Sequence, residues 1–242
     1  MATLNTYWQG NHDIGLDENH SEHLPESVNL FTSAEARRNG IHYLNDEVRL
    51  VASYLREQNS EPIPIRVYGN PRQPDFLNTS YAFTYLPYPS EGSVKAWENA
   101  PNDTETADIW VMHSPPKGHL DTITVTPLAG CEAQRQKIEA AKPMLCVFGH
   151  YHYSWGIERV RWGDNMSTIK SNILTLSPER QNEEKKTFPI KSNFDFTGHE
   201  IIDIGKETVF VNAAWMTMKK RSIQHRNQPI MVTIDMAARY AK

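Results

Sequence analysis

The chain is poor in the features that mark secreted, membrane-spanning and nucleic-acid-binding proteins. Its 242 residues include two cysteines, Cys131 and Cys146, too few for a disulfide framework, which favours a reduced, cytoplasmic protein. It lacks a run of about eighteen apolar residues that could cross a bilayer, and its first residues do not predict a secretory signal. A formal net charge of -4 provides no basic surface, so we expect neither nucleic acid nor membrane as a partner.

What remains is an ordinary globular composition, with 39% hydrophobic and 22% charged residues. A chain of this length can bury a sizeable core as one domain. Two polar stretches, residues 85–106 and 163–193, predict surface excursions rather than linkers, because strand-like segments resume after each. The sequence therefore predicts a single domain over residues 1–242.

Interleaved strands and helices predict an α/β layered fold. Two helices are expected: Asp46–Gln58, with Asn45 as its cap, and Cys131–Ala141, which ends before Pro143. Five apolar runs have the length and β-branched content of strands, and most are continuously apolar, as in strands covered on both faces. These runs are Ile63–Tyr68, Ile109–Met112, Met144–Phe148, Thr208–Val211 and Ile230–Ile234.

Histidines follow the ends of two predicted strands. His113 follows the second run, and His150 and His152 follow the third, directly after Gly149, which would allow a tight turn. Ligand sites of layered α/β proteins form at the carboxyl ends of strands, and imidazole is a common ligand for Zn, Mn and Fe. Two histidines one residue apart could reach two ions, as two-metal hydrolysis requires. The alternative for each is a hydrogen-bonded structural histidine.

Near the start of the chain stands Gly10-Asn11-His12-Asp13. An asparagine amide oxygen can bind a cation, and a neighbouring histidine can protonate a leaving alkoxide. Alone, this tetrapeptide is a plausible turn without chemistry. Its occurrence in order before His113 and the His-x-His pair makes coincidence a poor explanation.

In this ordered set the sequence resembles the calcineurin-like metallophosphoesterases, over residues 10 to about 235. The resemblance rests on several motifs together and is more specific than any one of them. The motifs are GNHD (10–13), VYGNP (67–71), HSPPKGHLD (113–121), GCE (130–132), FGHYHYSWG (148–156) and FVNAA (210–214).

The resemblance implies a layered β-sandwich of the metallophosphatase type, flanked by helices, that hydrolyses a small phosphodiester. It implies two divalent ions, from among Mn, Fe, Zn and Mg, with a bridging hydroxide that attacks phosphorus. Asn11, His113 and His150 would bind one ion, and His152 would bind the other. His12 would lie near the scissile ester, as a stabiliser of charge or a proton donor.

Other residues lie within the family motifs, but the resemblance implies no definite chemical role for them. Asp13, His119 and Asp121 would lie at the rim of the site or behind its ligands. Ser114 stands where the resembling branch has glycine, which predicts an altered turn.

The sequence departs from the family pattern upstream of Gly10. Family members carry a D-x-H and a G-D motif there, which supply two aspartates and a histidine, and a buried strand of the kind IVIAGNH; this chain has NTYWQ. We therefore expect a domain that is incomplete at its N-terminus and lacks its first strands. The alternative function is a non-catalytic truncated remnant that binds one ion or none. Substrate, metal and oligomeric state stay open.

Overall fold

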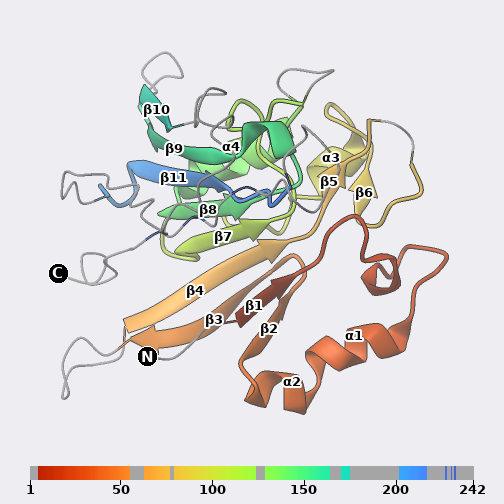
Figure 1. The fold of residues 1–242 in the computed structure, drawn as a ribbon. Coiled ribbons are helices and arrows are strands. Elements are labelled where there is room, and N and C mark those ends of the chain that lie inside the picture. Colours follow the sequence, from red (N-terminus) through yellow and green to blue (C-terminus); the bar gives the residue numbers. More distant parts are fainter. Residues whose placement is uncertain are drawn as a thin grey trace, which may run out of the picture.

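The computed structural model describes residues 5–54, 63–76, 79–123, 129–163, 170–174 and 202–216, together with residues 227, 230 and 232. Within these residues the main element is a mixed sheet of seven strands in the order β10-β9-β11-β8-β7-β4-β3 (Figure 1). Its strands are β3 (Glu47–Tyr54), β4 (Ile63–Asn70), β7 (Ile109–Met112), β8 (Leu145–Phe148), β9 (Gly156–Arg161), β10 (Lys170–Leu174) and β11 (Glu207–Asn212).

Two smaller sheets and several short helices surround the main sheet. In the described part of the chain, no helix has the length and apolarity that crossing a bilayer requires. The remaining strands are β1 (Asn5–Trp8), parallel to β2 (Ile41–Leu44), and β5 (Gln73–Pro74), parallel to β6 (Thr84–Tyr85). The helices are α1 (Pro25–Thr32), α2 (Ala34–Arg38), α3 (Glu91–Lys95), α4 (Glu132–Ala141) and the 3₁₀ turns η1 (Ile14–Leu16) and η2 (His152–Ser154).

The centre of the main sheet is parallel and covered on both faces. Strands β4, β7, β8 and β11 run in the same direction, while β3 and β9 are antiparallel to their neighbours. Trp110 and Phe148 point to one face, and Val111 and Leu145 point to the other, because side chains alternate along a strand. Continuous apolar runs therefore correctly predicted four of these strands, within two residues at each end, and the α/β class is confirmed.

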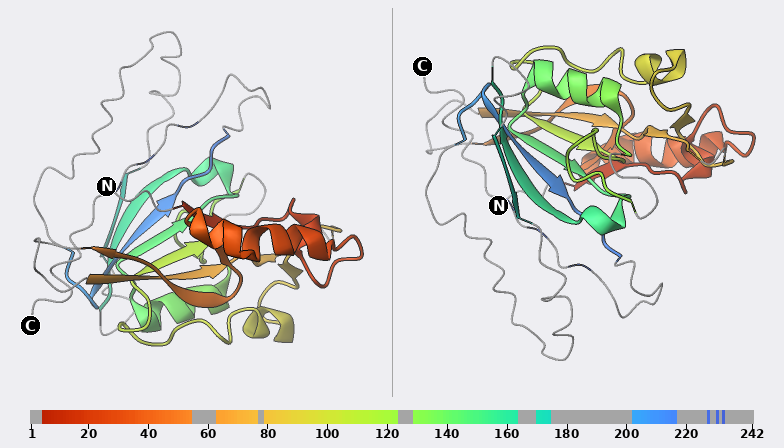
Figure 2. Two further views of the ribbon diagram at one scale, coloured as in Figure 1. Left: turned by 90° about the horizontal axis from the view of Figure 1, so that it is seen from below. Right: turned by 90° about the horizontal axis from the view of Figure 1, so that it is seen from above.

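Helix α4 covers the first face of the sheet (Figure 2). Ile138 and Ala141 are buried in the same cluster as Trp110 and Phe148. The helix ends at Lys142, which takes a left-handed backbone conformation before Pro143. The predicted helix at residues 131–141 is confirmed, and its end lies where the proline requires it.

The small β1–β2 sheet packs against the second face. Leu44 of β2 is buried with Val67 and Val111 of the main sheet. Its side chain fills the space that a Cβ on Gly69 would occupy. This close approach brings the loop that follows β1 toward the ends of β4 and β7. A strand thus precedes GNHD, while the metallophosphatase-type sandwich with missing first strands stays a prediction.

The predicted helix over residues 46–58 is wrong, because residues 47–54 form β3. Asp46 has a left-handed φ of 57°, which is incompatible with the first turn of a right-handed helix. Its N–H donates a hydrogen bond to the carbonyl of Gly69 in the neighbouring strand. Val48 packs on the first face of the sheet and Val51 on the second. A spacing of three between apolar residues thus arose from a strand buried on both faces, not from one face of a helix.

Two other expectations are revised by the structure. The stretch 163–193, expected as a surface excursion, contains β10, which pairs with β9 as an edge strand. Apart from residue 163 and β10, this stretch lies outside the described residues. The stretch 85–106 contains α3 and a fully buried Trp97, so it covers part of the core. The predicted strand Ile230–Ile234 lies largely outside the described residues, although Ile230 and Val232 pack on the second face.

Candidate metal centre

The carboxyl ends of the parallel strands meet at one edge of the sheet (Figure 1). Hydrogen bonds continue across this edge beyond the strands: the N–H of His113 donates to the carbonyl of Asn70, and the N–H of Gly149 donates to that of His113. The N–H of Ala213 donates likewise to the carbonyl of Phe148. The loops after β4, β7, β8 and β11 are therefore held side by side, as predicted from the motif positions.

Asn11 and His113 come together although 102 residues separate them. Asn11 is only 4% exposed, and its Oδ1 lies 3.0 Å from Nε2 of His113. The backbone N–H of Asn11 faces the same nitrogen at 3.4 Å. Two donor atoms that each lie about 2.1 Å from one ion, at right angles, are separated by about 3.0 Å. In the metal-free chain this distance is that of a hydrogen bond between the two side chains, and the same spacing suits two neighbouring ligands of one cation.

Gly10 makes this approach possible. A Cβ at position 10 would lie 2.5 Å from Cε1 and 2.7 Å from Nδ1 of His113, so a side chain there would collide with the imidazole ring. The N–H of Gly10 donates to the Asp13 carboxylate at 2.7 Å, and the N–H of Asp13 donates to the carbonyl of Gly10. Asp13 thus closes the turn that presents Asn11 and His12.

His150 joins the pair through a strained turn. Its φ is 64°, in the left-handed region, and the N–H of Tyr151 donates to the carbonyl of Gly149 at 2.7 Å, which closes a γ-turn around His150. Its ring centroid lies 4.6 Å from that of His113. We predicted Gly149 as the residue that permits the tight turn, and this is wrong: the left-handed residue is His150. Strain of this kind at a non-glycine residue is typical of functional sites.

His152 and His12 complete the group from two sides. Nδ1 of His152 lies 2.8 Å from the carbonyl oxygen of Met216, an acceptor that fixes the proton on Nδ1 and leaves Nε2 free. His12 is exposed, and its ring packs edge-on against Tyr81 at 5.1 Å. Sequence reasoning missed Met216 and Tyr81, since a backbone carbonyl and a surface aromatic give no motif.

The electrostatics of the centre favour neutral imidazoles. Burial, together with the nearby rings of His150, His12 and His152, lowers the pKa of His113 to about 3. Burial, with His152 and His12 nearby, lowers the pKa of His150 to about 4. Both rings are therefore uncharged at neutral pH, which is the form that binds a metal ion.

The metal-free protein should lose stability as the pH falls below about 6.5. In the unfolded chain both histidines take up protons near their ordinary pKa of about 6.5, whereas in the folded chain they do so only near 4 and 3. The unfolded state thus binds more protons in this window, and each histidine removes up to about 1.4 kcal/mol per pH unit. Urea unfolding at pH 7.0 and 5.5, with a chelator present, measures this loss.

The His113→Asn substitution should remove the His113 part of this pH dependence and leave the part that comes from His150. The window above pH 5 is suitable because the lowered pKa values of Glu132 and Glu207 act at more acidic pH. An equal slope in wild type and His113→Asn would contradict the burial of a neutral His113.

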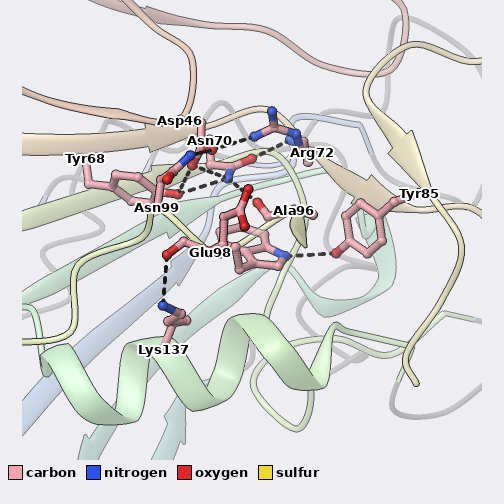
Figure 3. A network of polar contacts seen from close by, with 10 residues as sticks. Asp46, Tyr68, Asn70, Arg72, Tyr85, Ala96, Glu98, Asn99 and Lys137 are labelled. Atoms are coloured by element: carbon pink, nitrogen blue, oxygen red, sulfur yellow. Dashed lines mark hydrogen bonds and ion pairs between the residues drawn. The ribbon is translucent and has the colours of Figure 1, made fainter. Parts of the chain in front are cut away.

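A polar network supports the end of β4 (Figure 3). The amide nitrogen of Asn70 donates to Asp46 Oδ1, to the Tyr68 hydroxyl oxygen and to the carbonyl of Ala96, at 3.1, 2.9 and 2.9 Å. Arg72 pairs with the other oxygen of Asp46 at 3.0 Å. Since the carbonyl of Asn70 accepts a hydrogen bond from the N–H of His113, this network supports the backbone at His113. The sequence did not predict it, because Asp46 was assigned to a helix.

His119 is buried against the hydrophobic core. Its ring stacks on Phe210 with centroids 4.4 Å apart, and Nδ1 lies 3.2 Å from Oε1 of Glu158. Asp121 holds two loops together, because one carboxylate oxygen accepts from the N–H groups of Gly118 and Gly130 at 2.9 Å each. Their contacts are those of structural residues that support the loop after His113. A rim role for either stays a prediction.

Ser114 is buried, and its φ is not in the left-handed region, so the backbone there accepts a side chain. Glycine is therefore not a conformational requirement at this position. An altered turn relative to the family stays a prediction.

Asn11 and His150 each lie close to His113, and together the three residues offer one amide oxygen and two neutral imidazoles. The assignment of these residues to one ion and of His152 to a second stays a prediction. Within the described ranges, no group of three His, Cys, Asp or Glu side chains is placed to hold an ion, so the amide of Asn11 is needed to make a triad.

Comparisons with known proteins show partial similarity to a few curated proteins. No family model matches the chain. A stretch of 156 residues, 63% of the chain, is 32% identical to 13% of the probable rhamnogalacturonate lyase C of Emericella nidulans. A stretch of 172 residues, 69% of the chain, is 26% identical to metallophosphoesterase domain-containing protein 1 of Homo sapiens and of Mus musculus.

The chain spans 49% of the length of each mammalian relative and a much smaller part of the fungal one. The similarity to the mammalian proteins covers more than two thirds of this chain. The likeness is thus to proteins that are named for a metallophosphoesterase domain, over about half of their length.

Proposed function

We propose that this chain is a metal-dependent phosphoesterase that hydrolyses phosphodiesters at the carboxyl edge of its sheet. The observation that carries the proposal is the 3.0 Å approach of Asn11 Oδ1 to His113 Nε2, with the His150 ring 4.6 Å from that of His113. Asn11 and His150, from two distant segments, thus each lie close to His113, and all three side chains carry atoms that can bind a cation. The similarity to metallophosphoesterase domain proteins supports the same chemistry.

Asn11, His113 and His150 would hold one divalent ion, and His152 would contribute to a second. Bound ions of this class polarise phosphoryl oxygens and supply a nucleophile from water at neutral pH. Because burial keeps His113 and His150 neutral, both offer a lone pair without first losing a proton. The hydrogen bond from His152 Nδ1 to Met216 would orient its free Nε2 toward the site.

His12 would act on the leaving group. It adjoins the ligand Asn11 in sequence, is exposed to solvent and carries no hydrogen bond from any described residue that would occupy its ring nitrogens. A proton donated from His12 to the departing oxygen would neutralise the charge that develops there. Asp13 would hold the turn that places this ring.

A chain that binds a single ion without hydrolysis is the second candidate. It is favoured by the imbalance among the described residues, where one position has three donors and the other has His152. The two candidates differ in metal stoichiometry and in turnover, which are separately measurable.

After loading with Mn²⁺, the chain should contain at least one ion per molecule. It should then hydrolyse bis(4-nitrophenyl) phosphate in a metal-dependent reaction. Elemental analysis of the purified protein measures the content, and release of nitrophenolate measures turnover. Near two ions per chain would support the two-ion mechanism. One ion without turnover would favour the binding function. Substantially less than one ion in wild type, equal to that of His113→Ala, would contradict the proposed site.

A further inference from the structure

The segment formed by residues 79–85 is fastened to the loop that carries Asn11 and His12. The N–H of Ala82 donates to the carbonyl of Asn11 at 3.1 Å, and the N–H of Phe83 donates to the buried carboxylate of Asp17 at 2.6 Å. On its other side, the carbonyl of Phe83 accepts from the N–H of Gln73 at 2.9 Å. The segment is thus held from both sides and cannot shift independently of the candidate centre.

Phe83 anchors this segment in a hydrophobic cluster. Its buried ring packs with Leu16, Tyr43 and Ala82, and its φ of 56° is left-handed. A bulky residue adopts such a conformation only where the surrounding structure dictates it. The neighbouring residue Tyr81 is therefore presented by a fixed backbone, even though its side chain is 40% exposed.

His12 differs from the other site histidines in how its ring is held. Nδ1 of His152 lies 2.8 Å from the carbonyl of Met216, Nε2 of His113 lies 3.0 Å from Asn11, and a closed turn directs His150. In the described part of the chain the His12 ring makes no hydrogen bond, and its ring contact is with Tyr81, at 5.1 Å and an interplanar angle of 70°. The freedom of this ring is therefore limited by Tyr81.

We propose that Tyr81 is the positioning residue of His12, holding the imidazole where it can protonate the leaving group. This inference rests on the proposed phosphodiester hydrolysis. An edge-to-face contact between two aromatic rings is worth about 0.5–1.5 kcal/mol, enough to favour one orientation of an otherwise exposed ring. The aromatic ring of Tyr81 provides the contact, so its hydroxyl group is dispensable.

The dependence of hydrolysis on the leaving group tests this role. A 4-nitrophenolate leaves readily without protonation, whereas a phenolate gains much more from a proton donor. In the Mn²⁺-loaded chain, Tyr81→Leu should lower kcat for diphenyl phosphate roughly 10-fold and kcat for bis(4-nitrophenyl) phosphate less than about 2-fold, since general-acid catalysis contributes about 10²–10⁴-fold in full. KM should stay unchanged for both esters, and Tyr81→Phe should behave as wild type.

Phe76→Leu is the matched control, because Phe76 is an aromatic residue of similar exposure, 45%, with no ring contact to His12. A second readout is independent of turnover: in the metal-free chain, the ring-proton NMR signals of His12 should shift in Tyr81→Leu and stay in place in Phe76→Leu. Equal losses on the two esters in Tyr81→Leu would overturn the positioning role. A wild-type chain that hydrolyses neither ester would refute the proposed function, while unmoved His12 signals would overturn the ring contact itself.

Discussion

Gly10→Ala should disable the candidate metal centre while leaving the fold in place. The added methyl group would lie 2.5 Å from Cε1 of His113, closer than nonbonded carbon atoms approach. The His113 ring is the group that must move, and its displacement separates Nε2 from Asn11 Oδ1. A misplacement of about 1 Å in a catalytic group can cost about 10²-fold in rate. We expect a loss of that order in kcat/KM, with weakened Mn²⁺ binding by titration calorimetry.

Gly149→Ala is the matched control for this effect. Gly149 also adjoins a proposed ligand, but a Cβ there would meet the backbone of Ala214 at 3.8 Å, an ordinary van der Waals contact. Its φ is not left-handed, so alanine is not strained. We expect metal binding and turnover within about threefold of wild type, a difference below 1 kcal/mol. Similar losses in the two variants would show that glycine at position 10 has no specific steric role.

Four strands of the sheet, and with them the edge where His113 and His150 meet, could be predicted from the sequence. β4, β7, β8 and β11 are short apolar runs covered on both faces, a pattern with few alternatives once flanking polar residues limit its length. Parallel strands bring their carboxyl ends to one edge. The convergence of His113 and His150 therefore followed from strand ends alone, and their rings do lie together.

The remaining features depend on contacts that no local pattern encodes. β3 was mistaken for a helix because Val48 and Val51 lie on opposite faces of a strand, a spacing that local periodicity cannot separate from a helical one. The sequence also predicts the tight turn of the GHYH segment at Gly149, whereas the left-handed residue is His150. The γ-turn at His150 is set by the tertiary positions of its neighbours, which the local sequence does not encode. Tyr81 reaches His12 through a segment fixed by Asp17 and Phe83, and only the folded chain brings these together.

His150→Ala should abolish turnover, with kcat/KM lowered by at least roughly 1,000-fold, or about 4 kcal/mol in transition-state stabilisation. The substitution removes one of the three donors at the better-formed cation position, and a water molecule in its place cannot be held by the same strained turn. His42→Ala should leave turnover intact, because His42 lies on β2 and makes no ring contact or hydrogen bond with the site histidines. Steady-state kinetics with bis(4-nitrophenyl) phosphate measure both. Equal effects of the two substitutions would remove the case for the site.

His150→Gly separates the role of the imidazole from that of the turn. Glycine adopts a left-handed φ without strain, whereas alanine at this position costs roughly 1–2 kcal/mol. Glycine also gains entropy in the unfolded chain, which offsets about 0.5–1 kcal/mol of that difference. We therefore expect His150→Gly to be as inactive as His150→Ala yet up to about 1 kcal/mol more stable in urea unfolding. If the strained φ serves to aim the imidazole, the residue that relieves the strain must abolish function without unfolding the chain. A glycine variant that is less stable than the alanine variant would show that the left-handed turn is not the conformation of the folded protein.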